Sequence, residues 1–309
     1  MASVALVKGD DRYRNINAAL NLIRGGIDPE SIRGKQVLVK PNLVNASKPL
    51  TATHVDATRA VIDFVEEFNP GEVIVAEATA EGSTSEAYHR FGYDCLEGVR
   101  LVDINDDDYE LVNMETLEDG ERKVSISKTV LDADYIVSVA RAKTHDCVFC
   151  TLTIKNMMGT VPHVDHQWIH GGSVGPNGSV ETAIKSNYVL SKNLVTIFEK
   201  VGVNLGVVDG YVGMEGDGPI DGTPVYLGLA AAGLDCVAVD AVMTNVMGFD
   251  PRKKGDVYLA DEKGLGVGDL NRINVVGEKM AKVRMRLKPN RNYHLTQRWW
   301  MKYHLNYNG

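Results

Sequence analysis

The chain has 309 residues, 44% of them hydrophobic, with four cysteines and a formal net charge of -8. This composition is ordinary for a soluble globular protein, and four cysteines in this length do not make a disulfide framework. The amino-terminus lacks the charged start and long apolar run of a signal peptide, and the most apolar stretch, 226–249, is interrupted by Asp235 and Asp240. We therefore expect a cytoplasmic protein without a transmembrane segment.

The charge is unevenly distributed. The last acid is Glu278; the 31 residues that follow carry eight Lys and Arg, so the first 278 residues carry -16. Residues 279–309 also hold two tryptophans and three tyrosines, and we treat them as a basic aromatic tail behind a domain at 1–278. Such a tail either packs on its own acidic body or a second copy of the chain, or binds an anionic partner.

The first third alternates strand and helix patterns. Apolar runs predict strands at 3–8, 36–40 and 72–78, and apolar residues at helical spacing predict helices at 15–24, 56–68 and 83–91. Ser83 or Thr84 is placed as the cap of the last of these helices. This alternation is typical of parallel βαβ units with buried β-branched strands.

The middle of the chain has a different rhythm. Short strands are expected at 101–105, 109–113, 123–127 and 129–140, followed by a long helix at 181–201. Strand and helix patterns then return at 204–210, 224–233 and 235–248. The predicted fold is α/β, a mostly parallel sheet flanked by helices in one or two lobes, with added short antiparallel strands in the middle.

Three predicted strand ends carry polar motifs. VKPN ends the second strand, where Lys40 and Asn42 could hold a carboxylate or phosphate, or form a plain solvated turn. The turn before the helix at 83–91 could attract an anion, although Glu77 and Glu81 flank it and suit a metal or a basic group better. The glycine-rich stretch 207–224 begins at Asp209, taken as the end of a strand, and contains Glu215; a long loop of this kind is more often functional than decorative.

The segment 143–170 is the richest in chemistry. Lys143 and His145 lie at or past the end of a predicted strand, and Lys155 follows. CxxC at Cys147 and Cys150 is weak evidence for a metal, because the other two cysteines are distant and in apolar settings, so we expect strand packing. Three further histidines could be metal ligands or solvated loop residues: His163, His166 and His170.

Several motifs in a fixed order, among them KPNL, KTHDCVFCTLTIKNMMG, DGYVGMEGDGP and GLGVGDLNRINVVGE, resemble the DUF362 family of uncharacterised proteins. The resemblance covers nearly all of residues 1–278. It implies that the family's marked positions are Lys40, Lys143, His145, Lys155, Asn156, Glu215, Gly216, Gly218, Pro219, Asp235 and Asp240. Many relatives carry an added ferredoxin-type iron–sulfur domain, whereas the carboxyl-terminal part of this chain has no cysteine, so built-in electron transfer is not expected.

A looser similarity links His145, Lys155 and His170, in that order, to nickel-pincer lactate racemases. Those enzymes place a histidine before a lysine that carries their cofactor and a further histidine after it, although the surrounding racemase motifs are not reproduced here. The resemblance implies that a lysine-linked cofactor or a divalent metal is a candidate for this chain.

We weigh three functions. The first is an enzyme, of an isomerase or oxidoreductase type that depends on a metal or cofactor, acting on a small anion. In it, His145, Lys155, Lys143 and Glu215 are catalytic candidates, and the ligand-binding candidates are Lys40, Asn42, Asn156, Gly216 and Gly218. The second is a non-catalytic or electron-transfer protein that docks a separate ferredoxin through its tail. The third, nucleic-acid binding, is disfavoured because the body carries -16.

Overall fold

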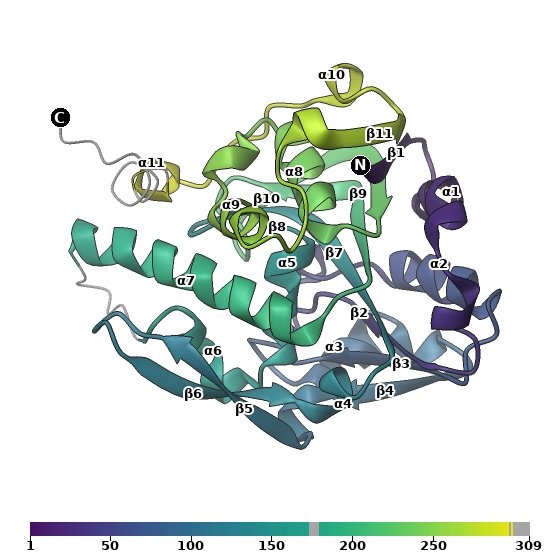
Figure 1. Cartoon of the computed structure of the whole chain (residues 1–309), viewed down its shortest axis with the longest axis horizontal. Coiled ribbons are helices and arrows are strands. Elements are labelled where there is room, and N and C mark those ends of the chain that lie inside the picture. The colour runs from purple at the N-terminus through teal and green to yellow at the C-terminus, as the bar shows by residue number, and fades with distance from the viewer. Residues whose placement is uncertain (173–178, 297, 299–309) are drawn as a thin grey trace.

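The structure is a computed structural model, and it describes residues 1–172, 179–296 and 298 (Figure 1). Its strands are β1 (Ala2–Lys8), β2 (Gln36–Lys40), β3 (Glu72–Glu77), β4 (Val99–Asp103), β5 (Tyr109–Glu115), β6 (Glu121–Ser127), β7 (Tyr135–His145), β8 (Phe149–Thr151), β9 (Leu205–Glu215), β10 (Thr223–Gly233) and β11 (Ile273–Gly277). Its helices are α1 (Arg12–Ile23), α2 (Val55–Glu66), α3 (Thr84–Arg90), α4 (Lys128–Leu131), α5 (Thr153–Asn156), α6 (His166–Ile169), α7 (Val180–Val201), α8 (Cys236–Val246), α9 (Gly255–Glu262), α10 (Met280–Val283) and α11 (Tyr293–Thr296).

One large sheet dominates the described part of the chain. Its strand order is β11-β1-β10-β9-β7-β2-β3-β4, and β8 pairs with the end of β7. The five strands from β9 to β4 are parallel, whereas β10 is antiparallel to both of its neighbours. The predicted mostly parallel sheet is therefore confirmed.

Helices cover both faces of this sheet (Figure 1). In β2, Val37 and Val39 point into the core beneath α1 and α2, while Leu38 points into the opposite core with α7, α8 and α9. Because both faces are buried, the parallel strands are continuous apolar runs rather than alternating ones. The strands predicted at 36–40 and 72–78 from their apolar runs are confirmed as β2 and β3.

Capping residues set where the helices begin. The Ser83 hydroxyl accepts a hydrogen bond from the backbone N–H of Glu86, which confirms the predicted cap of α3. Asp235 caps α8 through the N–H of Ala238, and its other carboxylate oxygen accepts from Val267 N at 2.9 Å. Asp235, one of the positions implied by the DUF362 resemblance, thus fixes a helix start and a distant loop.

Two of the short strands expected in the middle of the chain, 109–113 and 123–127, form the antiparallel hairpin β5–β6, which lies beside α7 (Figure 1). The strand expected at 101–105 is instead β4, which pairs parallel with β3 at the end of the large sheet. The strand predicted at 129–140 was wrong in its first part. Ser127 caps a helical turn, α4, and the strand β7 begins only at Tyr135.

Asp209 does not end a strand, contrary to the prediction. β9 continues to Glu215 and forms a hairpin with β10, so the connecting loop is confined to residues 216–222. Gly213 lies within β9, and a glycine is needed there because a Cβ would meet the carbonyl oxygen of Ala142 at 2.8 Å. The glycine signal therefore reflected close strand packing as well as a loop.

The cysteines follow the prediction only in part. Cys150 and Cys236 are buried and Cys147 is half-buried, but Cys95 is exposed in a short helical turn rather than in an apolar setting. The buried residue of this helical turn, which begins after Gly92, is Tyr93 and not Cys95.

Residues 279–296 lie against the body of the protein. Val283 and Leu287 are buried, and the Tyr293 ring packs 5.1 Å from that of Phe149, measured between centroids. The two tryptophans and the last two tyrosines of the tail lie outside the described residues. Whether the tail is a unit separate from 1–278 stays a prediction. Among the helices of the described residues, none is long and apolar enough to cross a membrane.

Candidate functional site

The candidate site lies where the strand order of the sheet reverses. From β2 the chain moves outward to β3 and β4, and it then returns to β7 on the other side of β2 before adding β9. Open α/β sheets bind ligands outside the carboxyl ends of the strands at such a point. Lys40 is the last residue of β2, and Lys143 and His145 end β7. The KPN and KTH motifs therefore meet there.

Lys40 forms a buried ion pair with Glu77, the last residue of β3. The Lys40 Nζ lies 2.8 Å from Glu77 Oε2, and both side chains are at most 2% exposed. Burial lowers the pKa of Lys40 and raises that of Glu77, and each partner opposes the shift of the other. The sequence left open whether Lys40 holds an external anion or lies in a plain solvated turn; the structure places a carboxylate of the protein beside it.

Gly159 is what lets the following loop approach this ion pair. A Cβ at Gly159 would lie 1.9 Å from Glu77 Oε1 and 2.6 Å from Lys40 Nζ. The Gly159 carbonyl also accepts a hydrogen bond from Ala78 N at 3.2 Å. The glycine of the LTIKNMMG motif is thus a packing requirement of the Lys40–Glu77 pair.

Lys143 is fully buried and surrounded by neutral acceptors. Its Nζ donates to the side-chain oxygen of Asn42 and to the carbonyl of Thr51 at 2.5 Å. Burial, with nearby Arg141 and Lys155, holds its pKa well below the usual value. Lys143 therefore orients Asn42, and the Asn42 amide forms part of the cavity wall described below.

A buried aspartate positions the helix that carries Lys155. Asp240 of α8 accepts hydrogen bonds from Thr153 N at 2.8 Å, Thr153 Oγ1 at 2.6 Å and Ile154 N at 3.1 Å. These are orphan donors at the start of the short helix α5. One turn on, Asn156 Nδ2 donates to the carbonyl of Lys40 at 3.0 Å, which ties α5 to the end of β2.

Lys155 is 9% exposed and has no carboxylate partner among the described residues. Its Nζ contacts the thioether sulfur of Met158 at 3.0 Å, a weak acceptor. Burial lowers the pKa of Lys155 to about 8. Of the three buried lysines at this sheet edge, Lys40 contacts a carboxylate and Lys143 contacts two neutral oxygen acceptors, whereas the contact given for Lys155 is a weak thioether acceptor.

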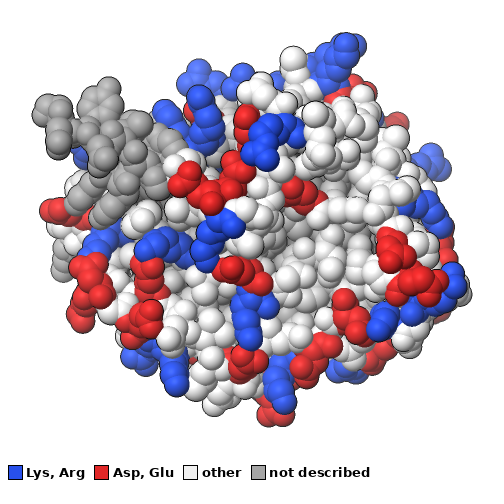
Figure 2. Space-filling view, viewed as in Figure 1, with Lys and Arg blue, Asp and Glu red and all other residues white. Residues whose placement is uncertain are grey.

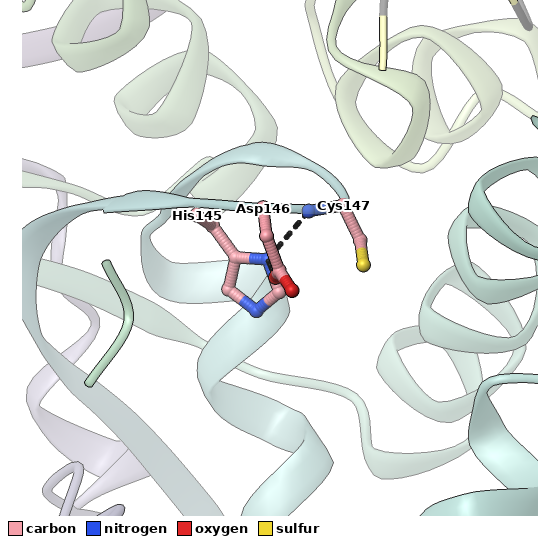
Figure 3. A group of neighbouring side chains, drawn as sticks. All are labelled: His145, Asp146 and Cys147. Atoms are coloured by element: carbon pink, nitrogen blue, oxygen red, sulfur yellow. Dashed lines mark hydrogen bonds and ion pairs between the residues drawn. The ribbon is translucent and has the colours of Figure 1, made fainter. Parts of the chain in front are cut away.

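His145 ends β7, and Asp146 and Cys147 follow it in the turn to β8; the three side chains lie on the same side of the backbone (Figure 3). The His145 Nδ1 lies 2.9 Å from Asp146 Oδ1 and 3.0 Å from the backbone N of Cys147. Burial lowers the pKa of His145, so the ring is neutral near pH 7. Burial alone would raise the pKa of the Asp146 carboxyl, but the interactions with His145 and other neighbours are stronger and lower it. Burial raises the pKa of the Cys147 thiol well above its usual value.

Two neighbouring cavities open at this end of the sheet. The inner cavity has a volume of about 160 Å³; its polar wall is formed by Asn42, Glu77, His145, Thr151, Lys155, His166 and His170. The Thr151 hydroxyl is buried in this wall without a hydrogen-bond partner among the described residues. The outer cavity, about 300 Å³, is bordered by Asp146, Cys147 and again His170. An unpaired buried hydroxyl is unusual, and it calls for a ligand or water to complete it.

The three later histidines do not form one set. His163 is exposed, and its ring lies edge-on to that of His166 with centroids 5.5 Å apart. The His166 Nε2 donates to the Val161 carbonyl at 2.8 Å, and burial lowers the pKa of that ring to about 4. His170 lines both cavities, and burial lowers its pKa to about 3. The structure therefore brings His166 and His170 to the site and leaves His163 at the surface.

The glycine-rich loop approaches from β9. A Cβ at Gly218 would meet the Thr144 carbonyl oxygen at 2.1 Å, and Thr144 Oγ1 donates to the carbonyl of Gly216 at 2.9 Å. Pro219 forms part of the inner wall, whereas Glu215 accepts from the backbone N of Lys288 at 2.9 Å. Glu215 thus anchors residues after 279 and faces away from the cavity.

Sequence reasoning missed several residues of the site. Asp146 and Thr151 carried no signal beyond their place in the KTHDCVFCT stretch, and no residue pattern distinguishes a paired hydroxyl from an orphaned one. Lys254 and Asp256, which line neither cavity, were not singled out either. They form a buried ion pair, Nζ to Oδ1 2.6 Å, in which both side chains are 0% exposed.

Residues 37–245 match the family described as Domain of unknown function (DUF362). The chain belongs to the DUF362 family. The chain is also 29% identical over 220 residues to the thylakoid-associated protein sll1697 of Synechocystis sp., a match that covers 71% of this chain and 64% of the relative. It thus spans less than two thirds of the length of that relative.

Among solved structures, the lactate racemase apoprotein from Thermoanaerobacterium thermosaccharolyticum is similar, with a TM-score of 0.48 and 14% identity. The similarity covers 67% of this DUF362 chain and 50% of the racemase. A similarity of this size carries no information on activity.

Proposed function

We propose that this DUF362 protein is an enzyme that binds a small carboxylated or phosphorylated compound in the inner cavity. The observation that carries the proposal is Lys155, a buried ammonium group in the cavity wall whose nearest acceptor is a thioether. A buried charge without a partner is costly. An anion in the cavity would complete this charge.

The other groups of the wall suit such a ligand. The Thr151 hydroxyl has no hydrogen-bond partner within residues 1–172 and 179–296, and the Asn42 side-chain oxygen accepts a hydrogen bond from Lys143. A volume of about 160 Å³ is close to that of an engineered cavity of about 150 Å³ that holds benzene, so a compound of a few heavy atoms fits. Lys40 takes no direct part, because Glu77 neutralises it.

His145 is the residue we assign to proton transfer. Its ring is 4% exposed, lines the inner cavity and is neutral near pH 7. Its Nε2 makes no hydrogen bond to the residues that the structure describes, so it can meet a ligand. A neutral imidazole in contact with the ligand can act as a general acid or base.

The proposal is tested by titrating the protein calorimetrically with glycolate, L-lactate, malonate and inorganic phosphate, and by following each mixture by NMR for chemical change. We expect one of these probes to bind, and His145→Ala to abolish turnover while binding persists. The proposal is wrong if no probe binds at millimolar concentration. If a probe binds and no conversion of it or of close analogues occurs, binding stands and the enzymatic assignment falls.

A specific observation favours a second candidate function, docking of an acidic partner such as a separate ferredoxin. Four basic residues are exposed in or beside α10, namely Lys279, Lys282, Arg284 and Arg286. Figure 2 shows several Lys and Arg side chains at the top of the molecule, the side on which α10 lies in Figure 1. Deleting the tail would uncover Val283 and Leu287, so the sharper test changes these four residues to Glu. Unchanged recovery of ferredoxin in a pull-down would exclude this function.

A further inference from the structure

The His145–Asp146–Cys147 turn carries three different metal-ligating atoms in one place. A ring nitrogen, a carboxylate oxygen and the Sγ lie within 4.8 Å of one another. The carboxylate lies 2.9 Å from His145 Nδ1. Asp146 and Cys147 border the outer cavity of about 300 Å³, whereas His145 lines the inner one.

The hydrogen bonds around His145 Nδ1 cannot all be made at once by a neutral ring. If Nδ1 accepts from the Cys147 amide at 3.0 Å, its lone pair faces the Asp146 carboxylate 2.9 Å away with no proton between them. If Nδ1 carries the proton instead, it donates to Asp146 and the amide loses its acceptor. A cation bound to both the imidazole nitrogen and the carboxylate removes the repulsion between the lone pairs of these two groups.

We propose that this turn binds a divalent metal ion of the zinc, cobalt or nickel type through His145 Nδ1, the Asp146 carboxylate and the Cys147 thiolate. Mixed nitrogen, oxygen and sulfur ligands are those such ions accept. Bond lengths of about 2.0–2.3 Å place tetrahedral ligand atoms roughly 3.3–3.7 Å apart, within the span of this cluster after small side-chain rotations. Three protein ligands leave a fourth position facing the outer cavity.

The charges and protons balance. The two positive charges of the metal are balanced by one carboxylate and one thiolate, so the three protein ligands and the metal together have no net charge. Cys147 releases its proton to solvent, and the His145 proton moves to Nε2 when it was on Nδ1. Binding therefore releases one proton and leaves an Nε2–H directed to the inner cavity. The proposal does not require that the inner cavity bind an anion.

Cobalt(II) spectroscopy tests the site directly, because a cobalt–thiolate bond gives a charge-transfer band in the near ultraviolet. After treatment with a chelator, the protein is titrated with Co²⁺. We expect one equivalent to bind with that band, and Cys147→Ser to abolish it. Cys150→Ser is the matched control: Cys150 is buried in β8 beside Thr244, 3.5 Å between Sγ and Oγ1, and its loss leaves the band intact.

Calorimetry with Zn²⁺ in two buffers of different ionisation enthalpy measures the proton count, and we expect release of one proton. Asp146→Asn keeps the size of the side chain and should weaken Zn²⁺ binding at least tenfold, which keeps the test valid if Cys147→Ser does not fold. His163→Ala, at an exposed histidine, should leave binding unchanged. Cobalt binding without a thiolate band, loss of the band in Cys150→Ser, or loss of binding in His163→Ala alone would overturn the proposal.

Discussion

Lys40 and Lys155 lie at the same edge of the sheet, are similarly buried, and have opposite surroundings. Lys40 is 2.8 Å from a carboxylate and donates to a carbonyl, whereas Lys155, among the residues placed by the structure, contacts only a thioether sulfur. The first arrangement is electrostatically complete, and the second is not. Lys40 thus has its counter-ion within the protein, whereas we propose that a bound anion supplies the one for Lys155.

The largest effect is expected where the complete arrangement is most tightly packed. Gly159→Ala should lower the free energy of unfolding by about 3 kcal/mol or more, because the new Cβ overlaps Glu77 and Lys40 and separates the buried pair. Chemical denaturation measures this. Gly25→Ala is the control, since a Cβ there meets nothing within 4 Å. Equal stability of the two variants would show that the loop does not approach the pair as described.

Replacing each lysine by methionine tests the comparison itself. Lys40→Met should destabilise by about 3–5 kcal/mol, because Glu77 keeps a buried charge without its counter-ion. Lys155→Met should leave stability unchanged or raise it by about 1–3 kcal/mol, because it removes a buried charge that lacks a counter-ion. The same denaturation experiment serves for both. Destabilisation of similar size in both variants would mean that Lys155 has a structural counter-ion after all.

Asp240→Ala should lower the free energy of unfolding by about 2 kcal/mol and should also weaken anion binding. The carboxylate satisfies backbone donors at the start of α5, and Lys155 is carried by that helix. Asp250→Ala gives a matched control, because Asp250 caps a different helical turn, 251–253, through the backbone N–H of Arg252 and makes no hydrogen bond to α5. A variant at Asp240 that loses stability but binds anions normally would separate the two roles.

The pH dependence of anion binding should follow Lys155. Its pKa is lowered to about 8 by burial; Cys147, Asp146 and Asp256 oppose this shift and Lys254 adds to it. Because the charged form binds the anion, affinity is fully present below pH 8 and should fall about tenfold for each pH unit above it, until the pKa of the complex is reached. Calorimetry between pH 6.5 and 9.5 measures this slope. A flat profile would contradict the role of Lys155.

The sequence predicted the large features of this molecule well, for physical reasons. Continuous apolar runs such as 36–40 and helical spacing such as 56–68 depend on short stretches of chain, and the structure confirms both. The order of polar residues at strand ends also predicted that Lys40, Lys143 and His145 would meet. The prediction that Asp209 ends a strand was wrong, because the strand continues by pairing with β10, which begins fourteen residues later in the chain.

The state of each site residue could not be predicted, because it depends on contacts between distant segments. Glu77 neutralises Lys40 from 37 positions away, and Asp240 holds α5 from 87 positions away in its contact with Thr153. Cys147 and Cys150 look alike in the sequence, yet one borders a cavity and the other is buried. Only the fold separates residues that are paired from residues that remain available.

The central claim is that Lys155 supplies the charge that a small anion meets in the inner cavity. Calorimetric titration of the anion that binds, in the wild-type protein and in Lys155→Met at pH 7, tests it most directly, with Lys263→Met at a surface ion pair as the control. A charge-assisted hydrogen bond contributes about 1.5–3 kcal/mol, so we predict a loss of affinity of about tenfold to a hundredfold in Lys155→Met alone. Equal affinity in all three proteins would contradict the claim.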